Sequence, residues 1–242
     1  MRLQLATWED VEGYLKSSNG IIVPAGSTEQ HGPIGLIGTD TLCAEDIAIQ
    51  AGVLADALVA PSFAYTPAPF NMAFAGTVSL SAETFQQMAS EVFGALAEHG
   101  FTRIYVLNGH GANLEPLRKV NLPGAQIRIR SWWDFDAVNE IRNKLYGEWE
   151  GMHATPSEIS ITQASHRIVD VTAPPRPNAP LTAEFMKAHA GDRHGPPKEH
   201  RAQFPDGRVG SDSAMASPQA GVQLLDAAAN AVAKDYQEFL KT

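Results

Sequence analysis

The sequence contains a single cysteine, Cys43, among its 242 residues. One thiol excludes an internal disulfide and a zinc site built from several cysteines. Positive charge is also scarce, because 18 lysines and arginines stand against 27 aspartates and glutamates, for a formal net charge of −9. This acidic balance argues against a surface that coats nucleic acid, so we expect no nucleic-acid partner.

Long apolar runs are missing as well. An aspartate interrupts each of the two most apolar windows, 47–65 and 224–233, and neither reaches the roughly 18 residues of a membrane span. Near the N-terminus, Glu9 and Asp10 arrive before any apolar stretch of signal-peptide length. We therefore expect no membrane association and a cytoplasmic location.

The composition is that of a folded protein with a sizeable core. Hydrophobic residues make up 44% of the chain and charged residues 19%. The length suits one domain, and we predict a single domain over residues 1–242. The stretch of about 172–212 differs from the rest because it holds seven prolines, and we interpret it as a loop excursion from that domain.

Strand-like and helix-like segments alternate along the chain. Short apolar runs predict strands, and apolar residues recurring at three and four positions predict helices. The predicted strands are 21–24, 57–61, 103–107 and 126–131, and the predicted helices are 41–54, 82–99, 156–165 and 219–240. This alternation is typical of an α/β fold with a mostly parallel central sheet.

The first polar motif, GSTEQHGP at 26–33, begins where the first predicted strand ends, and Asp40 follows it. Sites in open α/β sheets gather at the carboxyl ends of strands. Glu29 and His31 are two residues apart, so in an extended loop their side chains point to one side. Carboxylates with an imidazole suit Zn, Mn or Fe. The alternative is two ordinary loop residues and an N-cap at Asp40.

Two further motifs carry histidines. NGHGAN at 108–113 follows a predicted strand, and its glycines permit a tight turn that leaves His110 projecting; a polar turn with a chance histidine is the alternative. In MHATPSE at 152–158, Thr155 and Glu158 form a capping box, which is one complete role for Glu158. The other interpretation makes Glu158 a metal ligand and His153 a proton-transfer group.

Taken in this order, GSTEQHGP…GTD, NGHGAN and HATPSE resemble the motifs of the creatininase (creatinine amidohydrolase) family of metal-dependent amide hydrolases. The resemblance extends from about residue 21 to residue 160 and more weakly through the C-terminal helix. It implies a three-layer α/β/α sandwich, a site for two divalent metal ions (Zn, Mn or Fe) and a homo-oligomer, commonly a hexamer.

The resemblance also implies roles for individual residues. Glu29 and His31 resemble ligands of different metal ions, and Asp40 resembles the carboxylate that bridges them. His110 resembles a ligand of the ion that also binds Glu29. His153 matches the family's catalytic histidine in its place along the chain.

Two departures from the family pattern lie near the expected pocket. Creatininases carry Tyr-Glu after the metal-binding histidine, and that Glu is a ligand, whereas this chain has Gly111 and Ala112. We therefore expect Glu158 to complete the ligands of the second ion. Asn71 stands where the family often has a histidine, and we expect it to bind substrate.

The resemblance implies hydrolysis of a non-peptide C–N bond, in a cyclic amide or a formamide, by a metal-bridging hydroxide. Three carboxylates and a hydroxide would balance two divalent ions, and metal binding lowers the pKa of water to about 7. His153 would then pass a proton to the leaving nitrogen. Trp132 and Trp133 follow a predicted strand and are expected to line the substrate pocket, with core or interface positions as the alternative.

Two other functions stay open. One is a formamide hydrolase (deformylase) of nucleotide-type metabolism. The other is a catalytically silent metal-binding assembly protein that keeps the fold.

Overall fold

The computed structural model describes residues 1–172 and 174–242. Within them a single sheet of four strands has the order β2-β1-β3-β4, and each neighbouring pair is parallel. The strands are β1 (Gly20–Ala25), β2 (Leu58–Val59), β3 (Arg103–Asn108) and β4 (Gln126–Ser131). The predicted parallel sheet is thus confirmed, with strand bounds close to those expected.

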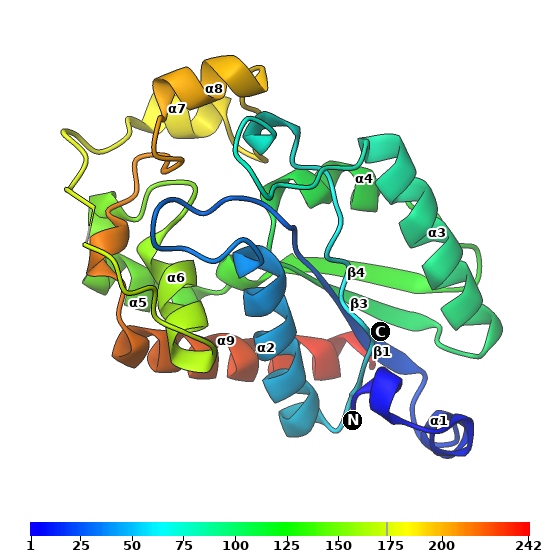
Figure 1. The fold of residues 1–242 in the computed structure, drawn as a ribbon. Helices are drawn as coiled ribbons and strands as arrows, with labels where there is room; N and C mark the ends of the chain where they lie inside the picture. The colour runs from blue at the N-terminus through cyan, green and yellow to red at the C-terminus, as the bar shows by residue number, and fades with distance from the viewer. Residues whose placement is uncertain (173) are drawn as a thin grey trace.

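Helices cover both faces of the sheet, which confirms the three-layer α/β/α sandwich (Figure 1). The first face packs against α2 (Thr39–Ala55), α5 (Asp136–Leu145), α6 (Pro156–Ser165) and α9 (Pro218–Phe239). The second face packs against α1 (Trp8–Leu15), α3 (Ala82–Glu98) and α4 (Leu114–Arg118). In the part of the chain that the structure describes, no helix combines the length and apolarity needed to cross a bilayer.

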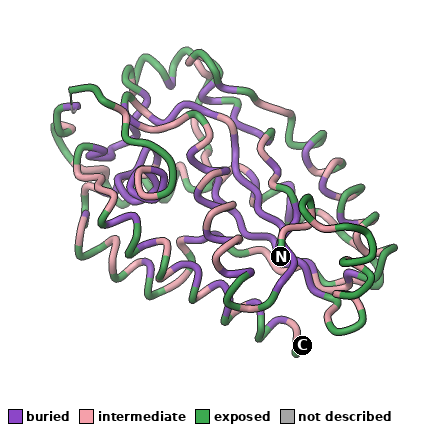
Figure 2. The backbone as a smooth tube through the Cα atoms, turned by 60° about the horizontal axis from the view of Figure 1, so that its bottom comes forward, coloured by how far each residue is buried: buried purple, intermediate pink, exposed green. Residues whose placement is uncertain are grey.

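The two central strands are buried on both faces. Along β1, Ile22 faces the cluster of α2 and α9, whereas Ile21 and Val23 face the cluster of α1 and α3. Alternate residues of a strand point to opposite faces, so a strand covered on both sides is apolar throughout. Figure 2 shows these strands as a buried interior between helices that are exposed on their outer turns.

The proline-rich segment 172–212 contains more regular structure than a loop. Two short helices, α7 (Ala183–Ala188) and α8 (Pro197–Gln203), lie together beyond the sheet at the top of Figure 1. Thr182 caps α7 by accepting a hydrogen bond from the Phe185 N–H, and a proline starts α8. For these two stretches the loop interpretation was wrong, because local caps stabilise helices too short to show a periodic pattern.

Candidate metal centre

The three polar motifs meet at the carboxyl end of the sheet. The loop after β1 and the loop after β3 both approach the first turn of α2, and the loop before α6 closes the group. A Cβ atom at Gly109 would lie 2.4 Å from the carbonyl oxygen of Asp40. Glycine at this position therefore permits the close approach that places His110 beside Asp40.

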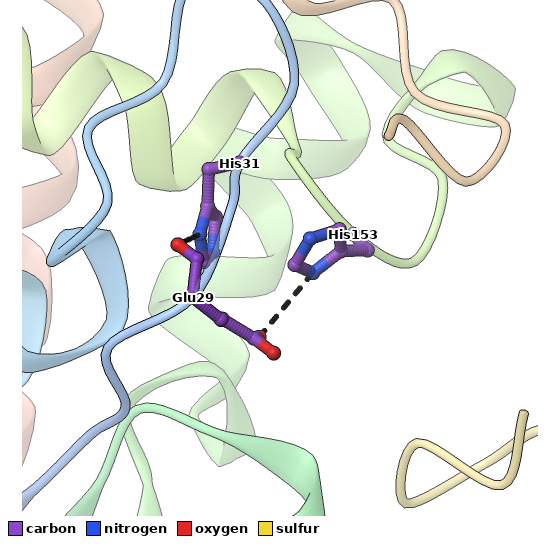
Figure 3. A group of neighbouring side chains, drawn as sticks. All are labelled: Glu29, His31 and His153. Atoms are coloured by element: carbon purple, nitrogen blue, oxygen red, sulfur yellow. Dashed lines mark hydrogen bonds and ion pairs between the residues drawn. The ribbon is translucent and has the colours of Figure 1, made fainter. Parts of the chain in front are cut away.

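Six ionisable residues form a buried cluster there, and none of these residues is more than 8% exposed. They fall into three overlapping groups whose ligand atoms lie within 4.8 Å of one another: Glu29–Asp40–His110, His31–Asp40–Glu158 and Glu29–His31–His153. Figure 3 shows the third group, with two side chains from the loop after β1 and His153 from the loop before α6. The structure thus brings together all six residues predicted as ligands or catalyst.

Asp40 belongs to two of these groups and faces a different histidine with each oxygen. Its Oδ1 atom lies 2.9 Å from Nε2 of His31, and its Oδ2 atom lies 2.9 Å from Nδ1 of His110. Gly38 is the N-cap of α2, so Asp40 stands inside the first turn and the N-cap interpretation was wrong. A carboxylate placed between two imidazoles in this way has the geometry of a bridging ligand.

Hydrogen bonds behind the cluster orient both imidazoles. His110 Nε2–H donates to the carbonyl oxygen of Pro67 at 2.7 Å, which directs Nδ1 towards Glu29 Oε1, 3.2 Å away. His31 Nδ1–H donates to the carbonyl oxygen of Glu29 at 3.1 Å, which directs Nε2 towards Asp40. Metal-binding histidines characteristically donate their other N–H to a backbone carbonyl or carboxylate.

The cluster also leaves an oxygen without a donor. Glu29 Oε1 is buried and has no hydrogen-bond partner among the described residues, although Oε2 accepts from Asn71 at 2.9 Å. A buried carboxylate oxygen that accepts no hydrogen bond and faces only imidazole nitrogens is costly unless a cation binds it. The residues present therefore fit a divalent metal ion between Glu29, Asp40 and His110.

Glu158 forms the predicted capping box and also lies near His31. Its Oε1 atom accepts from the Thr155 N–H at 2.5 Å, and its own N–H donates to Thr155 Oγ1 at 3.3 Å, which completes the capping box. The same Oε1 lies 3.7 Å from His31 Nε2. The cap is therefore present and also holds the carboxylate beside the second group, where its role as a ligand stays a prediction.

His153 is held by a residue that the sequence analysis did not single out. Its Nε2–H donates to the carbonyl oxygen of Gln30 at 2.6 Å, which leaves Nδ1 facing Glu29 Oε1 at 3.6 Å. The Gln30 side-chain amide donates to Asn71 Oδ1 and to the Gly207 carbonyl. Gln30 sits between two candidate ligands in the first motif, and that position was the only sequence signal for it.

Asn71 lies behind the cluster. It is fully buried and is bonded to Glu29 and Gln30. A cavity of about 260 Å³ opens onto the cluster, and Asn71 is not among its lining residues, whereas Trp132 and Trp133 are. The geometry therefore favours a positioning role for Asn71 and keeps both tryptophans as candidate substrate contacts.

The charges of the cluster shift its pKa values strongly. Burial would raise the pKa of Asp40, but the charges of His31 and His110 hold it well below its usual range. Burial would lower the pKa of His31, but Asp40 and Glu158 raise it to about 10. Burial raises the pKa of Glu158 to about 8, and it lowers the pKa of His153 to about 4. Raised and lowered pKa values within one buried cluster are typical of functional sites.

A fourth carboxylate enters the site from the segment between α7 and α8. Asp192 Oδ2 lies 3.6 Å from His110 Nδ1, and Asp192 lines the cavity. Burial raises its pKa to about 6. Asp192 was missed by the sequence analysis because it is 82 residues along the chain from His110 and no motif surrounds it.

Known proteins resemble this chain over its whole length. The family model described as "Creatininase: Creatinine amidohydrolase" matches residues 4–236. The structure superposes on a solved structure named "Creatininase Mn" with a TM-score of 0.76, at 23% sequence identity, covering 100% of this chain and 99% of the other. The fold of the two proteins is therefore the same.

Two curated relatives differ in their names. A creatinine amidohydrolase from Pseudomonas putida is 26% identical over 200 residues, covering 70% of this chain and 77% of that protein. A mycofactocin precursor peptide peptidase from Mycolicibacterium smegmatis is 41% identical over 103 residues, covering 40% of this chain and only 41% of that protein. The match thus spans less than half of the mycobacterial relative. Because the family model extends over nearly the whole sequence, the chain belongs to the creatininase family.

Proposed function

We propose that the chain is a two-metal hydrolase that cleaves the C–N bond of a small amide, either cyclic or a formamide. The observation that carries this proposal is the placement of Asp40, whose two oxygens each lie 2.9 Å from a different histidine. One ion would be held by Glu29, Asp40 and His110, and the other by His31, Asp40 and Glu158. Zn, Mn or Fe would suit these nitrogen and oxygen donors.

When bound, the ions would polarise the amide carbonyl and make hydroxide available at neutral pH. The residues of the chain supply the rest. His153 has its Nε2–H fixed on the Gln30 carbonyl, so Nδ1 is free to exchange a proton beside the cluster. It lines the cavity together with Trp132 and Trp133, whose rings pack edge to face with centroids 5.5 Å apart. These rings would form the apolar wall against which a substrate lies.

A peptide is the second candidate substrate. The identity of 41% to the mycofactocin precursor peptide peptidase, over 40% of this chain, supports it. Within the first class, a formamide of nucleotide-type metabolism is the alternative that the family resemblance implies for a glycine-rich turn after the histidine. The cavity of about 260 Å³ accepts a small amide whole, whereas a peptide would enter it by one end.

A substrate screen with the metal-loaded protein tests this proposal. Purified chain reconstituted with Mn²⁺ or Zn²⁺ is offered cyclic amides, formamides and short peptides, and release of the new amine is measured. Turnover that disappears in His153→Gln, with metal content retained, supports the hydrolase. Full metal occupancy without turnover of any class would instead favour the catalytically silent assembly protein.

We also propose a cytoplasmic homo-oligomer, as the family resemblance implies. Light scattering of the purified chain would give a mass several times 26.0 kDa if this is right. A monomer at micromolar concentration would contradict it.

A further inference from the structure

Asp192 reaches the metal centre from outside the three motifs. It lies in the turn between α7 and α8 with a left-handed backbone, φ 57°. Its Oδ2 atom accepts a hydrogen bond from the Ala112 N–H at 2.9 Å. The carboxylate side chain is only 12% exposed. An aspartate that crosses from a separate segment to sit within a buried cluster of carboxylates needs a positive partner there.

Gly111 makes room for this carboxylate. A Cβ atom at position 111 would lie 2.4 Å from Asp192 Oδ2 and 3.0 Å from its Cγ. Any residue other than glycine would therefore push the carboxylate out of its place. The glycine-rich turn after His110 and the position of Asp192 are thus two parts of one arrangement.

Asp192 approaches the group formed by Glu29, Asp40 and His110. His110 Nδ1 has three carboxylate oxygens around it: Asp40 Oδ2 at 2.9 Å, Glu29 Oε1 at 3.2 Å and Asp192 Oδ2 at 3.6 Å. The other nitrogen of this ring is engaged with the Pro67 carbonyl. Glu29, Asp40 and His110 thus form one group of ligand atoms within 4.8 Å of one another, and Asp192 reaches the nitrogen of that group from a fourth segment of the chain.

We propose that Asp192 is a fourth protein ligand of the metal ion held by Glu29, Asp40 and His110, and that metal binding fastens the segment 183–203 over the site. This rests on the proposed two-metal function. Asp192 supplies a carboxylate next to the turn after His110. In creatininases this turn carries a ligand Glu, at the position that is Ala112 in this chain. The carboxylates of the site would then number four, which balances two divalent ions before any hydroxide is bound.

The substitution Asp192→Asn separates a ligand from a hydrogen-bonded loop anchor. The amide oxygen of Asn can still accept a hydrogen bond from the Ala112 N–H, but the substitution removes the negative charge. We expect the affinity of one of the two Mn²⁺ ions, measured by competition with a chelator, to fall by about 10–100-fold. Gly111→Ala, which displaces the carboxylate sterically, should have the same effect. Glu184→Gln, an exposed change in the same segment, should leave both affinities unchanged.

Proteolysis gives a readout that does not depend on activity. Arg193 is exposed next to Asp192, and Mn²⁺ should slow tryptic cleavage after it several-fold in the unmodified chain but not in Asp192→Asn. If Asp192→Asn binds both ions as tightly as the unmodified chain, Asp192 is no ligand and the inference fails while the two-metal function stands. If the unmodified chain binds no Mn²⁺ or Zn²⁺, the proposed function itself fails.

Discussion

Asp40 Oδ2 lies 2.9 Å from Nδ1 of His110, and the other oxygen of the same carboxylate, Oδ1, lies 2.9 Å from Nε2 of His31. The Ser27 hydroxyl donates to Oδ2 at 2.7 Å and fixes the orientation of the group. The position of Asp40 in the first turn of α2 is also favourable for a negative charge, since the helix dipole is positive there. This one carboxylate therefore joins the two halves of the candidate metal centre.

Substitution of Asp40 should remove both metal ions. In Asp40→Asn we expect metal content to fall from near two per chain to near zero, because a bridging ligand serves each ion. In His110→Ala we expect the loss of one ion, since this histidine faces only the first group. Elemental analysis after supplementation measures both. Glu238→Gln, an exposed change on α9, is the control, and full metal content in Asp40→Asn would refute the bridging role.

Much of the architecture could be predicted because its signals are local. The strand 126–131 and the helix 156–165 have the predicted bounds, since one alternates in polarity and the other starts at a capping box and a proline. The helix α5 was missed although Val138, Ile141 and Leu145 recur at helical spacing and pack against the core, because these three residues make only a short apolar pattern. Contacts between distant segments have no local pattern, which is why Gln30 was predicted only as part of a motif.

In the candidate site too, residues within local motifs could be predicted and contacts between distant segments could not. The candidate ligands in the three motifs could be predicted because each motif follows a strand or starts a helix. Asp192 could not, because only the folded chain brings its segment to His110. Asn71 was expected at the substrate, yet its amide is used to hold Glu29, and no sequence pattern distinguishes these two roles.

Glu158→Gln separates the cap from the ligand. Glutamine can keep the capping-box hydrogen bond, so the melting temperature of the metal-free chain should barely change. The negative charge is lost, so the affinity of the ion in the group of His31 should fall by about tenfold or more. Calorimetry and chelator competition measure the two effects. If the affinity is unchanged, Glu158 is a cap and nothing more.

Asn71→Ala should weaken metal binding more than substrate binding. The change removes the donor to Glu29 Oε2, so we expect about a 10–100-fold loss of affinity for the ion in that group. At saturating metal, the KM should stay close to that of the unmodified enzyme. A raised KM with unchanged metal affinity would restore the direct substrate contact first expected for Asn71.

Creatinine should be a poor substrate. The absence of a Tyr-Glu pair at Gly111 and Ala112 changes the shape and polarity of the pocket, and Asp192 occupies part of the space. Missing polar partners can lower kcat/KM by about 10⁴–10⁵. With saturating Mn²⁺ or Zn²⁺ and millimolar creatinine, we expect creatine formation well below the typical enzyme turnover of about 10 s⁻¹. Turnover near that value would mean that these departures do not affect specificity.

The number and positions of bound metal ions test the account most directly. Crystals of the metal-supplemented chain should give two anomalous scattering peaks per chain with Mn²⁺ or Zn²⁺. We predict one peak among Glu29, Asp40 and His110 and a second among His31, Asp40 and Glu158, so that Asp40 contacts both. A single peak, or two peaks of which either lies away from Asp40, would contradict the two-metal centre.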